Sequence, residues 1–354
     1  MSREGNIVLP GRTVTVRRRW LNGRVPTPSV PLVHPVHRFA HHEIDFRRRI
    51  VTMAVVNRTP DSFYDDGAGA VLEDALAQAH AAADAGAEWV DVGGLPFAPG
   101  AELDPAEEAA RVVPLIAALR SGDGAGSSEA SRRLILSADT FQPAVAEAAL
   151  AAGADVVNDT TGLFHADLGR VVAAAGAHLV VTHSLAHVRG PRAVVPRPTY
   201  GDVVTEVRDH LRRTVDRAVA LGVPEERIIV DPGHDLNKNT RHTLEITRRL
   251  DEIATLGLPV LAAVSNKDFI GESLDRHRHE RLPGSLAAAA ACVYGGARIL
   301  RMHDADASVS AARMLECVFG WRQPARLVHN MGAENPPPDR STLAGHRAHR
   351  GGRA

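Results

Sequence analysis

One pattern recurs along residues 50–320 and restricts the chain to folds built on parallel strands. It consists of an alanine-rich amphipathic stretch, a glycine, and then a short apolar run. Glycine is the usual stop after a helix. Unbroken runs of Val, Ile and Leu are typical of strands buried on both faces of a parallel sheet. The runs predict eight strands, near residues 50–56, 88–92, 134–138, 154–158, 177–182, 227–231, 259–265 and 297–302.

Each predicted strand precedes a helical pattern, and the last helix is expected near residues 306–319. Eight such units over roughly 270 residues match a (β/α)8 TIM barrel in number and size. An open, doubly wound sheet is the competing α/β fold, but it normally has fewer units and a glycine-rich phosphate turn after its first strand. We therefore predict a barrel over residues 49–321, with a flexible basic N-terminal arm (1–48) and a disordered C-terminal tail (322–354).

The charge distribution limits the partners of this barrel. The formal net charge is −1, but residues 1–50 contain ten arginines against three acidic residues, whereas residues 51–320 contain 25 basic and 37 acidic residues. An acidic central domain disfavours nucleic-acid binding. The basic arm, with RRRW at 17–20 and RRRI at 47–50, could contact an anionic partner, although such stretches are more often simply solvated.

Membrane association and secretion are also disfavoured. No stretch approaches the ~20 apolar residues of a membrane span. The basic N-terminus is not followed by the apolar run and cleavage site of a secretory signal. The two cysteines, Cys292 and Cys317, lie in apolar helical stretches without metal-ligand spacing, as expected for free thiols in a reducing compartment. The sequence therefore predicts a cytoplasmic protein.

Polar side chains follow every predicted strand. In a (β/α)8 barrel the catalytic groups come from the carboxyl ends of the strands and the loops after them. Any single Asn or Asp there could instead cap the following helix, but polar residues after all eight strands indicate a functional rim. These residues are Asn57, Asp91, Asp139, Asn158 with Asp159, His183, Asp231, Ser265 with Lys267, and Arg301 with His303.

The lysines also belong to this rim. Of the 41 basic residues only Lys238 and Lys267 are lysine, and both fall in predicted rim loops. A compact ammonium can hydrogen-bond a ring carbonyl or a phosphate where the wide guanidinium of arginine does not fit. Chance in an arginine-biased composition is the alternative explanation.

The rim residues divide by chemistry. Arg301 and His303 occupy alternate positions of the last strand, so they should point to one side and could hold an anion such as pyrophosphate. Asn57 could bind a metal-bridged phosphate oxygen through its amide carbonyl. Carboxylate and amide acceptors could hold the N–H edge of a nitrogen heterocycle, and these are Asp139, Asn158 and Asp231.

Several short sequence blocks in this region form one ordered set: MAVVNRTPDSFYDDG at 53–67, DVGG at 91–94, PG at 99–100, ADT at 138–140, VNDTTG at 157–162, DPG at 231–233, SNKDFIG at 265–271, ER at 280–281 and RMHD at 301–304. Together these blocks resemble dihydropteroate synthase. They occur in the order and spacing of that family across residues 50–320, and NRTPDSF is a specific signature of it. The wording NRTPDSFYD and SNKD is most similar to the divergent second paralogue of actinobacteria.

The resemblance implies a barrel that condenses 6-hydroxymethyl-7,8-dihydropterin pyrophosphate with p-aminobenzoate and releases pyrophosphate in the presence of Mg2+. It also implies a homodimer and a loop at 58–67 that folds over the site. By motif, the pterin would be held by Asp91, Asp139, Asn158, Asp231 and Lys267. The pyrophosphate would be held by Asn57, Arg301 and His303, with Asn57 also on the metal. The catalytic residues would be Lys267, Arg301 and His303.

The expected second-substrate site departs from the family pattern. After the second strand the family has Gly-Glu-Ser-Thr-Arg-Pro-Gly, whose Ser-Thr-Arg portion helps form the p-aminobenzoate pocket. Two other family motifs also differ in this chain. The family's Ser-Arg-Lys reads Ser-Asn-Lys, with Asn266 at the centre. The family's Gly-Phe-Gly reads Asp-Leu-Asn, with Leu236 in place of the Phe. Losing an arginine that pairs with a bound carboxylate typically costs ~2–5 kcal/mol. The residues that replace Glu-Ser-Thr-Arg are apolar: Leu95, Pro96, Phe97 and Ala98.

Two functions therefore remain open. One is a dihydropteroate synthase-like transferase with weak or altered use of its arylamine. The other is a catalytically inactive pterin-binding paralogue that does not serve folate synthesis. A pterin-dependent methyltransferase is a less favoured third reading, because a methyl donor has no pyrophosphate for Arg301 and His303 to hold.

Overall fold

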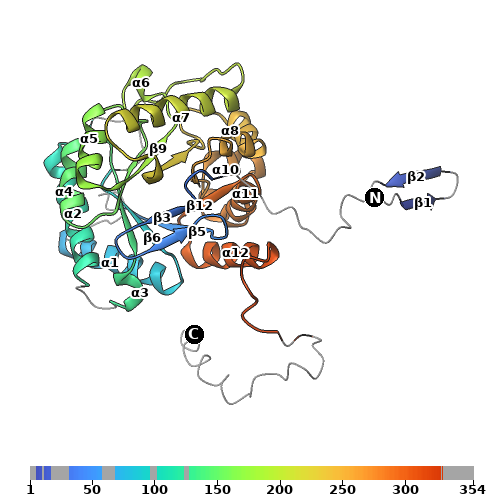
Figure 1. Cartoon of the computed structure of the whole chain (residues 1–354), viewed down its shortest axis with the longest axis horizontal. Helices are drawn as coiled ribbons and strands as arrows, with labels where there is room; N and C mark the ends of the chain where they lie inside the picture. Colours follow the sequence, from blue (N-terminus) through green and yellow to red (C-terminus); the bar gives the residue numbers. More distant parts are fainter. Residues whose placement is uncertain are drawn as a thin grey trace, which may run out of the picture.

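A computed structural model describes residues 5–9, 12–16, 32–57, 68–95, 102–122, 127–327 and 329. Eight parallel strands close into a barrel in which consecutive strands pair and the last strand pairs with the first (Figure 1), which confirms the predicted (β/α)8 architecture. The barrel strands are β5 (Val51–Asn57), β6 (Trp89–Gly93), β7 (Ile135–Asp139), β8 (Val156–Asp159), β9 (His178–Thr182), β10 (Ile228–Asp231), β11 (Val260–Ala262) and β12 (Ala297–Met302).

The strands occur where the apolar runs predict them, with one difference at β11. The prediction for this strand extends to residue 265, but β11 ends at Ala262. Its pairing with β12 shifts register between Val260 and Leu261. A bulge of this kind bends a strand away from its ladder, so residues 263–265 leave the sheet and start the rim loop.

Helices surround the barrel (Figure 1). Gly122 and Gly176 end α2 and α5 with φ values of 76° and 64°, the left-handed conformation that favours glycine after a helix. No helix within the described ranges is long and apolar enough to cross a bilayer. The helices are α1 (Ala68–Asp84), α2 (Pro105–Ser121), α3 (Glu129–Arg132), α4 (Pro143–Ala151), α5 (Ala166–Ala175), α6 (Ala186–Arg189), α7 (Val203–Ala220), η2 (Glu225–Arg227), α8 (Thr240–Arg248), α9 (Leu250–Ala254), α10 (Asp268–Leu274), η3 (Arg278–Glu280), α11 (Leu282–Tyr294) and α12 (Ala305–Val318).

A short hairpin from the N-terminal region closes the amino end of the barrel. In this hairpin β3 (Val36–Arg38) pairs antiparallel with β4 (Glu43–Asp45). Phe39, Ile44 and Phe46 are buried in one cluster with inward-facing side chains of the barrel strands. Because this end is filled by apolar side chains, polar groups inside the barrel can reach a ligand only at the carboxyl end.

The other described residues of the N-terminal region are two strands, β1 (Gly5–Leu9) and β2 (Arg12–Val16), which pair antiparallel. Residues 17–31 of the predicted flexible arm lie outside the described residues. The predicted disordered tail also lies outside them from residue 330 onward. The limits given for the arm, the barrel and the tail stay predictions.

Candidate functional site

Asp91 lies in the middle of β6 with its carboxylate fully buried inside the barrel. It accepts hydrogen bonds from the Ser137 hydroxyl of β7, from Asn158 Nδ2 of β8 at 3.0 Å, and from Arg301 Nε of β12 at 2.7 Å. Ser137 in turn accepts the indole N–H of Trp89 at 2.8 Å. A buried carboxylate requires such partners. Asp91 therefore fixes the orientation of Asn158 and Arg301 at the rim.

Arg301 links this buried group to the barrel mouth. Its Nη2 donates to Asp139, at the end of β7, at 2.8 Å, while its Nε bonds Asp91. The Asp139 side chain remains 24% exposed. Burial, and then the negative charge of Asp91, raises the pKa of Asp139 to about 7. A carboxyl group that titrates near neutrality can either accept or donate a hydrogen bond toward a bound heterocycle.

Asn158 has one hydrogen-bonding group without a partner. Its buried Oδ1 bonds no other group among the described residues, although its Nδ2 is held by Asp91. Leaving a buried acceptor unpaired costs about 1–3 kcal/mol, so this oxygen is suited to the N–H group of a ligand. The adjacent Asp159 has a different role, because it accepts the backbone N–H groups of Thr161 and Leu163 and so shapes the turn after β8.

Asp231 and Lys267 add a buried acidic group and a half-buried basic group. Asp231 ends β10 with 4% of its surface exposed and accepts the Gly233 N–H at 2.7 Å. Burial raises the pKa of Asp231 and lowers the pKa of Lys267, which follows β11. Arg281 donates to the Lys267 carbonyl at 3.2 Å and pairs with Asp268 at 3.0 Å. The Arg of the ER motif therefore positions the turn that carries Lys267.

Lys238, the other lysine, is bonded within the protein. Its Nζ donates to the carbonyl oxygens of Gly233 at 2.8 Å and Leu236 at 2.9 Å, and it lies 2.9 Å from Nδ1 of His183. Burial lowers the pKa of Lys238 to about 7. These contacts hold the loop after β10 against the end of β9. Both lysines thus lie in rim loops as predicted, but Lys238 binds main-chain carbonyls.

Asn57 and His303 lie at the edge of this cluster. Asn57 is the exposed last residue of β5, and its Oδ1 would be 3.1 Å from a Cβ at Gly93, so glycine keeps space for this side chain. The His303 backbone N–H donates to Ser265 Oγ at 3.1 Å, and its exposed side chain borders a separate hollow beside α1. Arg301 points into the barrel instead, so a joint anion site for Arg301 and His303 stays a prediction.

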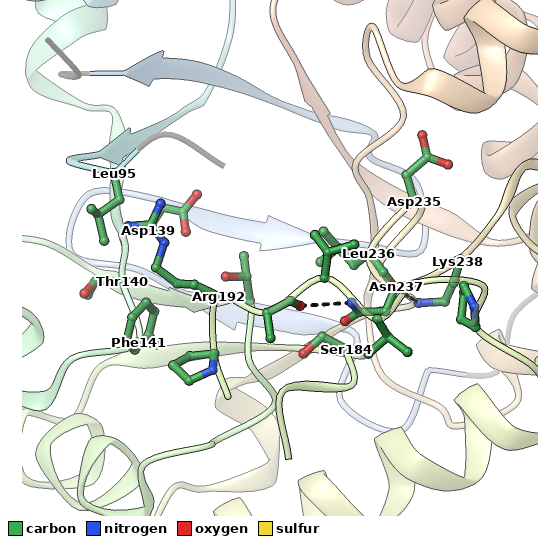
Figure 2. A pocket seen from close by; sticks show the side chains of 16 residues that line it. Leu95, Asp139, Thr140, Phe141, Ser184, Arg192, Asp235, Leu236, Asn237 and Lys238 are labelled. Atoms are coloured by element: carbon green, nitrogen blue, oxygen red, sulfur yellow. Dashed lines mark hydrogen bonds between the residues drawn. The ribbon is translucent and has the colours of Figure 1, made fainter. Parts of the chain in front are cut away.

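A cavity of about 180 Å³ opens beside Asp139 (Figure 2). Leu95 borders it, as does Leu236, which is 6% exposed. Asn266 has φ 56° and donates its backbone N–H to Ser285 in the turn before Lys267. Leu95 and Leu236, two of the residues predicted to alter the second-substrate site, therefore share one cavity. The rest of that apolar loop, Pro96, Phe97 and Ala98, lies outside the described residues, as does the loop at 58–67.

Sequence reasoning missed the opposite wall of this cavity. That wall is formed by residues between α6 and α7, among them Arg192 and Val194, and Phe141 lines the cavity after β7. No motif marks the segment. Its only signal is length, because a long connection at the carboxyl end of a barrel is where ligand contacts concentrate.

The rim as a whole can recognise a planar heterocycle. Asp139, Asp231 and the free oxygen of Asn158 offer acceptors, while Arg301 and Lys267 offer donors. No group of three or more His, Cys, Asp or Glu side chains in the described part of the chain could hold a metal ion by itself.

Comparison with known proteins assigns the family. The family model for pterin binding enzymes matches residues 53–303. The chain is 42% identical over 287 residues to inactive dihydropteroate synthase 2 of Mycobacterium leprae, covering 80% of this chain and 95% of that protein. Two structures of Xanthomonas albilineans dihydropteroate synthase are also similar, each covering 80% of this chain and 98% of that chain. The structure with 4-aminobenzoic acid has 34% identity and a TM-score of 0.71, and the complex with 7,8-dihydropteroate has 33% and 0.69. Because the matched region spans the whole barrel from its first strand to its last, this chain belongs to the pterin-binding enzyme family, together with the dihydropteroate synthases.

Proposed function

We propose that this protein binds 6-hydroxymethyl-7,8-dihydropterin pyrophosphate at the barrel mouth and transfers the pterin to an arylamine, with weak or altered use of p-aminobenzoate. The observation that carries the proposal is the hydrogen-bonded cluster of Asp91, Asn158, Arg301 and Asp139, which leaves the Asn158 oxygen for a ligand N–H. The solved relatives bound to 4-aminobenzoic acid and to 7,8-dihydropteroate support it.

In this reaction the C–O bond between the pterin methylene and the pyrophosphate breaks, and the electron pair leaves with the pyrophosphate. The arylamine nitrogen then forms the new C–N bond and loses a proton to solvent. Asp139, Asn158 and Asp231 would hold the N–H edge of the ring while it donates electron density to the methylene. Fixed charges and dipoles of this kind are usually the largest catalytic contribution.

The residues present fit a Mg2+ ion that is shared with the pyrophosphate. Mg2+ keeps several waters and usually takes only one or two protein oxygens besides substrate phosphates. The exposed Asn57 side chain at the end of β5 offers such an oxygen. When bound, the ion would neutralise charge on the leaving group. Arg301 and His303 would contribute to the same neutralisation.

The second substrate is where the activity should differ from that of the family. Leu95 and Leu236 give this side of the mouth an apolar surface where the family pattern has polar residues and an aromatic ring. An apolar wall gives no hydrogen bond to a carboxylate, and losing such bonds costs ~2–5 kcal/mol, or about 30-fold to several-thousand-fold in affinity. Arylamines other than p-aminobenzoate should therefore be used at least as well.

Pyrophosphate release tests this proposal. Purified protein would be incubated with the pterin pyrophosphate, Mg2+ and a panel of arylamines with and without a carboxylate. We expect release above background with at least one arylamine, and its loss in Asn158→Ala. Arg170→Ala, on the outer face of α5, is the control and should keep the rate. No release with any arylamine would exclude the transferase.

A non-catalytic pterin-binding protein is the second candidate function. The name of the M. leprae relative, inactive dihydropteroate synthase 2, favours it, as does the apolar wall at Leu95. Calorimetry separates the two functions: sub-micromolar binding of the pterin pyrophosphate without turnover supports the second. Growth of a strain lacking its own synthase, restored by this chain, would contradict it.

We also propose a cytoplasmic homodimer without nucleic-acid or membrane partners. The acidic balance of residues 51–320 is unsuited to nucleic acid. Exposed apolar side chains on α11 and α12, namely Tyr294, Met314 and Val318, offer a contact for a second copy. Sedimentation velocity would test the dimer, and a single species at monomer mass would contradict it.

A further inference from the structure

The long connection between β9 and α7 forms one wall of the cavity beside Leu95. We call residues 184–200 of this connection the strap. The strap contains one short helix, α6, and several of its residues line the cavity. A connection of this length without strands of its own is expected to move unless other residues hold it. The contacts that hold the strap therefore decide whether the cavity has a fixed shape.

Asn237, in the loop after β10, bonds the strap at three points. Its Oδ1 accepts the Leu185 N–H at 3.0 Å, its Nδ2 donates to the Ala193 carbonyl at 3.2 Å, and its own carbonyl accepts the Tyr200 hydroxyl at 3.0 Å. In Figure 2 a dashed line at Asn237 marks the bond to Ala193. The three bonds fall near the start, the middle and the end of the strap, so one residue fixes its whole length.

Asn237 is itself held in place through the next residue, Lys238. The Lys238 ammonium donates to the Gly233 and Leu236 carbonyls of the same loop, at 2.8 and 2.9 Å. It also donates to the carbonyl of His183 at 3.3 Å, and His183 directly precedes the strap. The strap is therefore anchored on the ends of β9 and β10, two paired strands of the barrel.

The turn around Asn237 gives its two polar side chains separate partners. Asp235 and Asn237 have φ values of 63° and 51°, the left-handed conformation that Gly, Asn and Asp tolerate best. Asp235 accepts the Thr243 hydroxyl at 2.9 Å and the Phe269 N–H at 3.1 Å, whereas Asn237 bonds the strap. Glycine, which the family pattern has at both positions, would keep the turn but offer no side chain to the strap.

The cavity that the strap closes on one side is small and largely apolar. Leu95, Phe141, Val194 and Leu236 are among its lining residues, and its volume is about 180 Å³. An apolar cavity of roughly 150 Å³ accommodates benzene. A wall that stays in place therefore leaves little room for a second fused ring, whereas a wall that can move outward would admit one.

We propose that Asn237 is a positioning residue that holds the strap as a fixed wall, so that the cavity exists before any ligand binds and admits small apolar amines in preference to larger ones. The choice of amines as ligands rests on the proposed function, in which an arylamine is the second substrate. The fixed position of the strap is a property of the ligand-free protein and can be measured without any substrate.

Hydrogen exchange on the full-length, ligand-free protein tests the position of the strap. Asn237→Gly removes both side-chain bonds and keeps the turn. We expect peptides covering residues 184–200 to exchange at least about fivefold faster in this variant, as for the loss of one or two hydrogen bonds. Asn237→Asp keeps an acceptor for the Leu185 N–H but loses the donor to Ala193, so its exchange rate should be intermediate. Asp235→Gly, the matched control in the same turn, should leave exchange of the strap unchanged.

Binding of two amines tests what the fixed strap does. Aniline and 1-naphthylamine carry the same amino group on one ring and on two fused rings. Calorimetry would measure both amines with and without the pterin pyrophosphate and Mg2+. We expect the wild type to bind aniline without the pterin. Asn237→Gly should raise the affinity for 1-naphthylamine relative to aniline about tenfold or more, because an overpacked fit is relieved. Arg170→Ala on α5 should keep the wild-type ratio.

The outcomes separate this inference from the proposed function. Dependence of strap exchange and of the amine ratio on Asn237, in a protein that does not bind the pterin pyrophosphate, would contradict the proposed function only. The inference would be overturned by unchanged strap exchange in Asn237→Gly, by an unchanged amine ratio, by aniline binding that requires the pterin, or by no binding of either amine at millimolar concentration. Where Asn237→Gly unfolds at a lower temperature, the comparison with Asn237→Asp is made at a temperature where all variants are folded.

Discussion

Removing the carboxylate of Asp91 should destabilise the barrel more than any exposed substitution. Asp91→Ala takes away one charge-assisted bond to Arg301 and two further bonds, to Asn158 and Ser137. A hydrogen bond to a charged group contributes about 1.5–3 kcal/mol and a neutral one about 1 kcal/mol. Arg301 keeps Asp139, so it is not left wholly unpaired. The expected loss in free energy of unfolding is therefore about 3–5 kcal/mol.

Urea unfolding, followed by far-UV circular dichroism and by tryptophan fluorescence, measures this loss. Fluorescence is informative because the Trp89 indole donates to Ser137, which is itself a partner of Asp91. Asp91→Asn should lose less, since an amide oxygen can still accept one of the bonds. The control is Asp167→Ala on α5, whose pair with Arg170 leaves its side chain 75% exposed, and no measurable change is expected.

The Asp91→Ala variant should also bind the pterin pyrophosphate weakly, although Asp91 is buried. Without it, Asn158 and Arg301 lose the partner that orients them. A loss in stability below about 1 kcal/mol would show that the Asp91 hydrogen bonds are replaced by water. Unchanged pterin affinity in a folded Asp91→Ala protein would refute the idea that this carboxylate organises the rim.

Three further predictions concern charge, metal and position. Because the folded protein raises the pKa of Asp139 from 3.8 to about 7, the stability that its proton contributes is full below about pH 4 and is lost as the pH rises through 7. The unfolding midpoint of Asp139→Asn should therefore fall less between pH 5 and pH 8 than that of the wild type, and parallel curves would contradict this. Chelation of Mg2+ should weaken binding of the pterin pyrophosphate about tenfold or more but leave binding of the pterin alcohol unchanged. In calorimetry, Asn57→Ala should remove this dependence of pterin pyrophosphate binding on Mg2+. A dependence on Mg2+ that persists in Asn57→Ala would rule out Asn57 as a metal ligand. Arg281→Lys should lower the affinity for the pterin without greatly changing the unfolding midpoint, because it loosens the turn that carries Lys267. If calorimetry gives the same pterin affinity for Arg281→Lys and the wild type, this turn does not contribute to pterin binding.

The architecture could be predicted from the sequence because its determinants are local and repeated. Runs of Val, Ile and Leu followed by alanine-rich helices indicate strands that are buried on both faces of a parallel sheet. Eight such strand–helix units leave few alternatives to a closed barrel. The rim followed from the same logic, since the carboxyl ends of parallel strands meet at one edge. Asp91 and Arg301 are 210 positions apart in the chain, yet they bond directly. The end of β11 was overestimated because a register shift has no local signature.

The roles of individual rim groups depended on contacts between loops. The sequence alone placed both lysines at the mouth, but only the fold shows that Lys238 donates to the Gly233 and Leu236 carbonyls. It likewise predicts a joint anion site for Arg301 and His303, which stays a prediction, and only the structure shows that Arg301 bonds Asp91 and Asp139. The cavity wall between α6 and α7 has no repeat or periodicity that could mark it. Its position is set by hydrogen bonds between Asn237 and residues 44 and 52 positions away, and such long-range pairings exist only once the barrel has brought its loops to one end.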